Sequence, residues 1–352
     1  MNIKGSVLKQ LSLLLIITLG LIILFVMNLF FGSVTLQLRD VWEVLTKDAS
    51  ATDAVKWSII MQFRMPQALT AMLAGSGLAV AGLLLQTLFR NPLADPSILG
   101  ISSGASLGVA LLVLGFGAAS GYAADFSGWL GHIGIVMASF SGAMLILVLI
   151  TFLGRYLSNT VSLLIAGIMI AYMAGALVGI AKYFSQKEDL QAFVLWGMGS
   201  FSNVGPQQLI FLSAGTLGGL LYSFFLIKPL NMLLLGERYA ANLGLNVRKT
   251  KVIILFLSGF LTAVITAYTG PIAFLGLAVP HLARNIFRNS NHVVLVPASV
   301  LLGAALALFC NLVARLPGFD TSLPINAVTS LIGAPIVVWI IIKRQHLYTT
   351  SN

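Results

Sequence analysis

The feature that most constrains this chain is the spacing of its charged residues. Cutting the sequence at every Asp, Glu, Lys and Arg leaves nine long uncharged stretches. Each can hold a helix of about 20 residues, enough to cross about 30 Å of hydrocarbon. The stretches are 10–38, 65–89, 96–124, 126–154, 156–181, 190–227, 252–283, 289–314 and 321–342. With only 9% charged and 58% apolar residues, a soluble fold is excluded, because soluble domains carry about 25% charged residues.

The number of crossings follows from the two ends of the chain. Both ends are basic, which requires an even number of spans because Lys and Arg collect on the cytoplasmic side. Gly270-Pro271 divides 252–283 into two spans, since this pair breaks a helix. GMGSFSNVGP breaks 190–227, leaving a partial or re-entrant segment and then one span. The sequence therefore predicts an all-α polytopic protein with ten transmembrane helices and cytoplasmic termini.

The distribution of charge agrees with ten spans. In this topology the inner side carries thirteen basic and two acidic residues, a net +11, and the outer side seven basic and eight acidic, a net −1. The formal charge of +10 is therefore explained by topology, which excludes nucleic acid as a partner. The predicted parts of this single domain are a first helix at about 11–32, a first repeat at about 65–181, a sixth helix at about 206–227, an inner helix at about 232–246 and a second repeat at about 252–342.

The predicted membrane interior lacks ionisable groups. Ion-coupled carriers keep such groups inside the bilayer, so a secondary transporter with inverted repeats is the weaker alternative here. His132 and His281 lie near span ends, where a hydrogen-bonded interfacial role outweighs a haem or metal ligand. The lone Cys310 lies in an apolar run and offers no disulfide or metal site. We expect no cofactor, and no serine has a histidine partner that would make an intramembrane hydrolase.

Small residues recur where helices meet. Residues 100–108 contain two overlapping GxxxG spacings and 175–179 contain another, which allow close helix packing. These uncharged faces either pack helices or line a wide pore. The chain has no GxxxxGK[ST] phosphate loop, so ATP hydrolysis would require another polypeptide.

Two similar segments run in opposite directions in this topology. Asn91-Pro92-Leu93-Ala94 precedes Leu99-Gly100, and Gly270-Pro271-Ile272-Ala273 precedes Leu275-Gly276. An inverted repeat about an axis in the membrane plane would produce such a pair, although a match this short can arise by chance.

Several longer motifs resemble the FecCD family, the permease subunits of ATP-binding-cassette (ABC) importers for iron-siderophores, haem and cobalamin. They are Arg64-Met65-Pro66, GLLLQTLFRNPLADPSILGISSGASLG from Gly82, Gly236-Glu237 with Ala240 and Leu243-Gly244, GPIAFLGLAVPHLAR from Gly270, and Leu323-Pro324 with Gly333-Ala334-Pro335. The resemblance implies the inverted-repeat permease fold of type II importers and a location in the inner (cytoplasmic) membrane. It also implies a homodimer or a pair of homologous permeases, two cytoplasmic ATP-binding subunits and a substrate-binding protein outside. The chain itself would not be an enzyme, and the metal chelate carried is left open.

The resemblance assigns coupling to the ATPase to the inner segment 232–246, predicted as one short amphipathic helix. The matching residues are Gly236, Glu237, Arg238, Ala240, Leu243 and Gly244, with Glu237 and Arg238 at the rim of the contact. From the residues alone the segment could be merely an interfacial helix.

The resemblance also implies docking and gate residues. Arg64, at the start of the second helix, and Arg315, at the end of the ninth, would pair with carboxylates of the binding protein; by themselves they read as interfacial anchors. Gln67 stands where the family has a third arginine. Thr160 and Val161 match the cytoplasmic gate, although Val161 replaces a hydroxyl residue. Ser322-Leu323-Pro324-Ile325-Asn326 departs from a Glu-Leu-Pro-x-Gly pattern, with unknown consequence.

Overall fold

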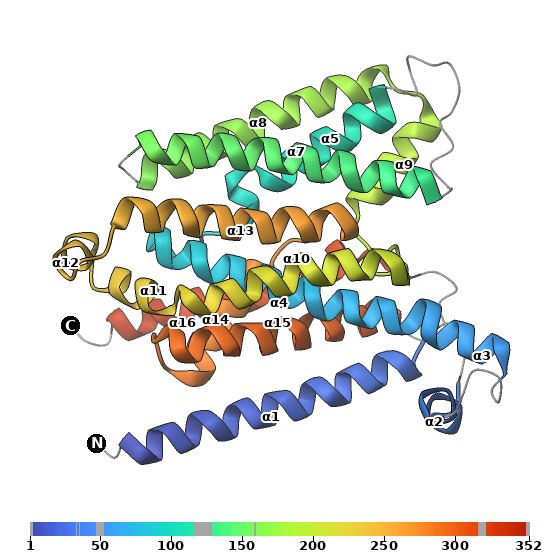
Figure 1. Ribbon diagram of the computed structural model, residues 1–352, viewed down its shortest axis with the longest axis horizontal. Coiled ribbons are helices and arrows are strands. Elements are labelled where there is room, and N and C mark those ends of the chain that lie inside the picture. The colour runs from blue at the N-terminus through green and yellow to red at the C-terminus, as the bar shows by residue number, and fades with distance from the viewer. Residues whose placement is uncertain are drawn as a thin grey trace.

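The protein is a bundle of helices. The computed structural model describes residues 3–32, 34, 36–46, 53–115, 129–157, 160–315 and 322–349, and within these ranges there is no strand. Figure 1 shows long helices lying side by side, with α11 and α12 projecting at the end where α1 begins and α16 ends. The all-α prediction is therefore confirmed, while the side of the membrane on which the termini lie stays a prediction.

Helices occupy all the predicted positions. The first part of the chain contains α1 (Ile3–Phe30), α2 (Leu38–Thr46), α3 (Ala54–Ser58), the π-helical η2 (Ile59–Arg64), α4 (Met65–Phe89), the 3-10 turn η3 (Pro96–Leu99), α5 (Ile101–Ala110), the π-helical η4 (Leu111–Gly115), α7 (Trp129–Tyr156) and α8 (Thr160–Phe184). The second part contains α9 (Lys187–Gly197), α10 (Pro206–Phe225), α11 (Ile227–Leu234), α12 (Glu237–Asn242), α13 (Val247–Thr269), α14 (Leu275–Phe287), α15 (His292–Ala314) and α16 (Ile325–Thr349).

Seven of the described helical segments are long and apolar enough to cross a membrane alone. Two shorter apolar segments, Ile101–Gly115 and Ile325–Trp339, lie in predicted spans, and α14, with 13 residues, fills the remaining position. The count of ten crossings stays a prediction, because α14 is shorter than the about 20 residues that cross about 30 Å of hydrocarbon.

The second predicted helix begins earlier than its uncharged stretch. Helical structure runs without interruption from Ala54 to Phe89 through the π-turn η2. Pro66 has no N–H to donate and its ring would crowd the carbonyl four residues back. The N–H of Met65 bonds instead to the carbonyl of Ile60, five residues back, and this wider turn accommodates the proline. Arg64 therefore lies inside a continuous helix and does not open it.

Helices α4 and α13 form the centre of the bundle. Most of the α4 side chains are buried, and α4 packs against α10, α13, α14 and α15. Glycines allow the closest approaches: a Cβ at Gly75 would clash with the carbonyl oxygen of Gly303, and one at Gly82 with that of Gly276. The GxxxG spacing after Gly100 serves the same purpose, because Gly104 and Gly108 pack on the backbone of α7.

The two similar segments found in the sequence have similar local geometry. A left-handed residue precedes the helix that follows in each: Gly100 before α5 and Phe274 before α14. Gly270, with φ +71°, ends α13 as predicted from the Gly-Pro pair. This likeness supports the inverted-repeat interpretation.

Candidate functional site

The inner segment expected at 232–246 is two helices joined at a glycine. α11 ends at Leu234 and α12 covers Glu237–Asn242, so the prediction of one helix is wrong. Gly236 adopts φ +119°, a conformation that side-chain-bearing residues avoid. Glu237 opens α12, where its negative charge is favourable beside the helix N-terminus.

The end of α12 is a Schellman motif. Gly244 has φ +86°, and its N–H donates to the carbonyl of Ala241 at 2.9 Å. The N–H of Leu245 donates to the carbonyl of Ala240 at 3.0 Å, and Ala240 is fully buried. The two glycines therefore fix where α12 begins and ends, which gives this short helix one defined orientation.

Two polar contacts attach this segment to the central helices. Arg90 follows α4 and donates from Nη2 to the carbonyl oxygen of Leu233 at 2.7 Å. Lys251, near the start of α13, pairs with Glu237 at 2.7 Å. In the sequence, the position of Arg90 directly after the long uncharged stretch 65–89 is the signal that points to this residue. The Glu237–Lys251 pair therefore links α12 to α13, and the Arg90–Leu233 hydrogen bond links α11 to the end of α4.

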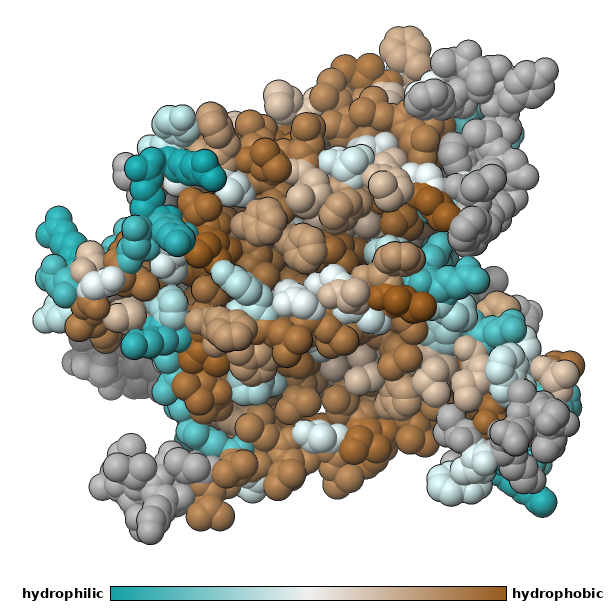
Figure 2. Space-filling model, in the orientation of Figure 1, coloured by the Kyte–Doolittle hydropathy of each residue, from teal (hydrophilic) through white to brown (hydrophobic). Residues whose placement is uncertain are grey.

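The outer surface of this segment combines exposed apolar side chains with polar ones. The side chains of Leu235, Tyr239 and Leu243 are 64%, 67% and 55% exposed, and Arg238 beside them is also exposed. In Figure 2 hydrophobic and hydrophilic atoms alternate over this projecting end. An exposed apolar patch with a polar rim is typical of a surface that binds another protein. Leu243 lies in this patch, whereas Leu245 packs against the core.

Arg64, one of the two outer arginines, is buried. Its side chain is 2% exposed, and Nη1 donates to the carbonyl oxygens of Leu29 at 2.9 Å and Phe30 at 2.7 Å, while Nη2 donates to that of Val34. These carbonyls lie at and beyond the C-terminus of α1, where a cation is favourable. In this position Arg64 anchors α1 to the helix that contains α4.

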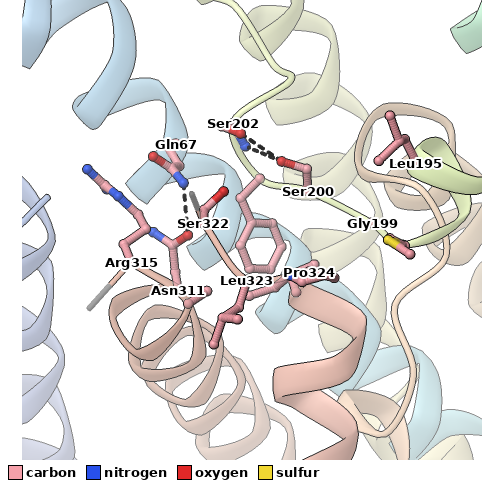
Figure 3. A pocket seen from close by; sticks show the side chains of 14 residues that line it. Gln67, Leu195, Gly199, Ser200, Ser202, Asn311, Arg315, Ser322, Leu323 and Pro324 are labelled. Carbon is pink, nitrogen blue, oxygen red and sulfur yellow. Dashed lines mark hydrogen bonds between the residues drawn. The ribbon is translucent and has the colours of Figure 1, made fainter. Parts of the chain in front are cut away.

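Arg315 follows α15 and borders a cavity of about 150 Å³. Its Nη1 is buried without a hydrogen-bond partner, and burial lowers the pKa of this guanidinium. Gln67 lies in the same cavity and donates to Oδ1 of Asn311 at 3.0 Å, as Figure 3 shows. Asn311 in turn donates to Oδ1 of Asn28 at 2.7 Å. Gln67 thus belongs to a buried polar chain between α4, α15 and α1.

Asn326, which departs from the Glu-Leu-Pro-x-Gly pattern near the C-terminus, has a structural role. Oδ1 of Asn326 accepts from the N–H of Ala273 at 3.1 Å, and the N–H of Asn326 donates to the carbonyl of Met198 at 3.2 Å. Asn326 therefore joins the start of α16 to the loop after α13 and to the end of α9.

The predicted gate residues lie at the beginning of α8. Thr160 is the first residue of this helix, but its side chain lies outside the described part of the chain, and Val161 is 60% exposed. The exposed face of α8 continues through Gly175 and Gly179, and a Cβ at either glycine would meet nothing within 4 Å. The second GxxxG spacing therefore does not pack against another helix in the part of the chain that the structure describes.

Other candidate groups are structural. His281 is buried and its Nε2 lies 2.7 Å from the carbonyl oxygen of Pro92, which confirms the hydrogen-bonded interpretation for this residue; His132 is exposed. Cys310 is buried with a free thiol. Burial raises the pKa of Asp95, opposed by hydrogen bonds from Ser97. Among the described residues no group of three or more His, Cys, Asp or Glu side chains could hold a metal ion.

Comparisons with known proteins agree with the motif resemblance. The model of the FecCD transport family matches residues 20–343. The chain is 36% identical over 315 residues to the hemin transport system permease protein HmuU of Yersinia pestis, covering 89% of this chain and 90% of that protein. It is 38% identical over 287 residues to the vitamin B12 import system permease protein BtuC of Klebsiella pneumoniae subsp. pneumoniae, covering 81% and 83%.

A solved structure described as an inward-facing conformation of a metal-chelate type ABC transporter has the same fold. The TM-score is 0.81 with 32% identity, over 94% of this chain and 99% of that one. These likenesses extend over nearly the whole length, and the resemblance inferred from the motifs is confirmed. The chain belongs to the FecCD transport family.

Proposed function

We propose that this chain is the membrane-spanning permease subunit of an ABC importer that carries a metal chelate across the cytoplasmic membrane. Permeases for hemin and vitamin B12 are among its relatives. The observation that carries the proposal is the exposed apolar surface of α11 and α12, which is attached through Arg90 and Lys251 to the two central helices. An importer permease driven by a separate ATPase requires such a connection.

The ATPase acts on this surface in the proposed mechanism. Two cytoplasmic ATP-binding subunits bind the α12 surface, with Arg238 and Leu243 in the contact, and their closure moves α12 as a unit. Gly236 and Gly244 define the ends of that unit. Glu237 supports it from within through Lys251, so its role is internal. With ten crossings and cytoplasmic termini, as we propose for this chain, α12 would lie on the same side as the ATPases.

A second copy completes the pathway. Gly175 and Gly179 form a small-residue face that no described helix of this chain covers, and such faces let helices approach closely. The face of α8 packs against a second copy of the chain or a homologous permease, and the substrate passes between the two. Thr160 and Val161, at the inner end of the same helix, form the cytoplasmic gate.

A substrate-binding protein docks on the outer end. Arg315 is the better candidate for a direct contact, because its buried Nη1 lacks a partner and a carboxylate would supply a charge-assisted hydrogen bond. Arg64 stabilises this region indirectly, because its hydrogen bonds fix the end of α1.

The test uses the reconstituted importer in vesicles. Leu243→Arg changes an exposed side chain and is expected to lower chelate uptake at least tenfold while ATP hydrolysis by the partner subunits continues. Trp42→Arg, at an apolar residue in α2 that is 68% exposed against 55% for Leu243, is the matched control and should leave both rates unchanged. Normal uptake by Leu243→Arg would contradict the assignment of α12.

A further inference from the structure

An apolar groove on the side of the bundle ends at a cationic pocket. The groove has a volume of about 520 Å³ and lies between α7, α10 and α13. It is lined by Thr151, Arg155, Gly218, Gly219, Tyr222, Val252, Ile253, Phe256, Leu257 and Phe260. Figure 2 shows the exposed face of α7, α13 and α10 as mainly hydrophobic, with hydrophilic residues at its two ends, one of which carries α12. In the membrane this face meets lipid.

The adjoining pocket is positively charged. It has a volume of about 420 Å³ and shares Arg155 with the groove. Arg248 and Lys251 also line it, and Glu237 is the one carboxylate among the residues that line it. Three cations against one carboxylate leave a net charge of about +2, which favours an anion. The N-terminus of α13 borders the same pocket through Val247 and adds its partial positive charge.

The cations have few internal partners. Nη2 of Arg248 donates to the backbone carbonyl of Arg155 at 2.6 Å, which holds the two arginines together without neutralising either. Both side chains are exposed. Lys251 pairs with Glu237 at 2.7 Å. The guanidinium groups are therefore presented to whatever occupies the pocket.

A polar atom without a partner lies inside the groove. The hydroxyl oxygen of Thr151 is buried and makes no hydrogen bond, which is costly in an apolar setting. Thr151 precedes Arg155 by four residues on α7, so the two side chains lie on one face about one turn apart. If an anionic group of a ligand binds at Arg155, a hydrogen-bond acceptor of the same ligand that lies further along the groove would accept the hydrogen of this hydroxyl.

We propose that the groove and the pocket together bind one anionic phospholipid of the leaflet beside α12. The phosphate lies between Arg155 and Arg248, an ester carbonyl accepts the hydroxyl hydrogen of Thr151, and an acyl chain lies along Phe256 and Phe260. Gly218 leaves room for that chain, because a Cβ there would meet nothing within 4 Å. Lys251 touches both the phosphate pocket and Glu237, so an occupied site borders α12.

Native mass spectrometry of the full-length chain, released from detergent after incubation with lipid, tests this assignment. Phosphatidylglycerol and phosphatidylcholine with identical acyl chains are the probes. Phosphatidylglycerol should be retained at least fivefold more strongly. Arg155→Gln should reduce its retention about fivefold, and the double variant with Arg248→Gln more than tenfold, since each cation contributes about 1 kcal/mol near anionic lipid. Lys249→Gln, an exposed lysine outside the pocket, is the control and should bind normally.

The apolar part is tested separately. Gly218→Leu should reduce retention of both lipids by filling the groove, whereas Gly20→Leu, at another glycine with open space, should not. Thr151→Val should weaken lipid retention without lowering thermal stability. Because this variant keeps both arginines, it tests the proposal even if the double arginine variant fails to fold. Equal retention of the two lipids by the unmodified chain would overturn the proposal. So would displacement by glycerol 3-phosphate or inorganic phosphate alone, which would indicate a site for a free anion.

Discussion

Replacing Arg64 separates an anchoring role from a docking role. Its guanidinium donates to the carbonyl oxygens of Leu29, Phe30 and Val34, and its side chain is 2% exposed. In Arg64→Met the side chain is of similar length and apolar, but all three hydrogen bonds are lost. Because these carbonyls are at the end of α1, the helix would lose its main polar attachment to the bundle.

The expected cost follows from those three bonds. A hydrogen bond involving a charged group contributes about 1.5–3 kcal/mol, so the set would give at least about 4.5 kcal/mol if nothing replaced it. Water at the membrane edge can hydrate some of the carbonyls, and we therefore expect a loss of about 3–4 kcal/mol. Arg64→Lys keeps the charge but not the planar fork and should recover only part of this loss.

Thermal unfolding of the purified chain in detergent, followed by tryptophan fluorescence, measures the effect. The matched control is Arg39→Met, because Arg39 is 82% exposed and forms an ion pair with Glu43 at 3.1 Å, an interaction of about 0.3–0.5 kcal/mol. Arg64→Met should unfold at a clearly lower temperature, with earlier proteolysis of the segment after α1. An unfolding midpoint equal to that of the control would refute the anchoring role and would favour a docking role for Arg64.

Three further outcomes are expected. Gly175→Leu with Gly179→Leu should convert the proposed dimer to monomer in size-exclusion chromatography, while Gly20→Leu should not; a dimer unchanged by the double substitution would exclude this face of α8 as the interface. Asp95→Asn should raise the unfolding temperature at pH 7, since burial raises the pKa of this carboxyl and ionisation then opposes folding. Protonated Asp95 favours folding at low pH, and this contribution to stability is lost as the pH rises through its raised pKa. The difference in unfolding temperature between Asp95→Asn and the unmodified chain should therefore shrink on acidification. A difference independent of pH would contradict this cause. Gly82→Val should destabilise the chain by more than about 2 kcal/mol, because a Cβ there would meet the backbone of Gly276, and normal folding yield and stability would refute that close approach.

Helix positions could be predicted from the sequence because charge is so costly inside a membrane. The uncharged stretches located every long helix, and the Gly270-Pro271 break was correct because glycine and proline act through local backbone geometry. The π-turn before α4 was missed, because Lys56 and Arg64 interrupt the uncharged pattern although the helix continues through both.

The candidate site was less predictable because it depends on contacts between distant residues. The division at Gly236 could have been inferred from the two glycines that flank α12. The contact of Arg90 with Leu233, 143 residues away, could not. An arginine near a membrane surface can extend outwards or turn back on the backbone, and only the fold determines that Arg64 does the latter.

The central claim is that a separate ATPase drives this chain. Uptake of a metal chelate into vesicles, measured with and without the ATP-binding subunits in the same membranes, tests it most directly. We predict that uptake requires both the ATPase subunits and ATP, and that it is unaffected when ion gradients are collapsed. Uptake that persists without the ATPase subunits and follows an ion gradient would contradict this account and favour a secondary transporter.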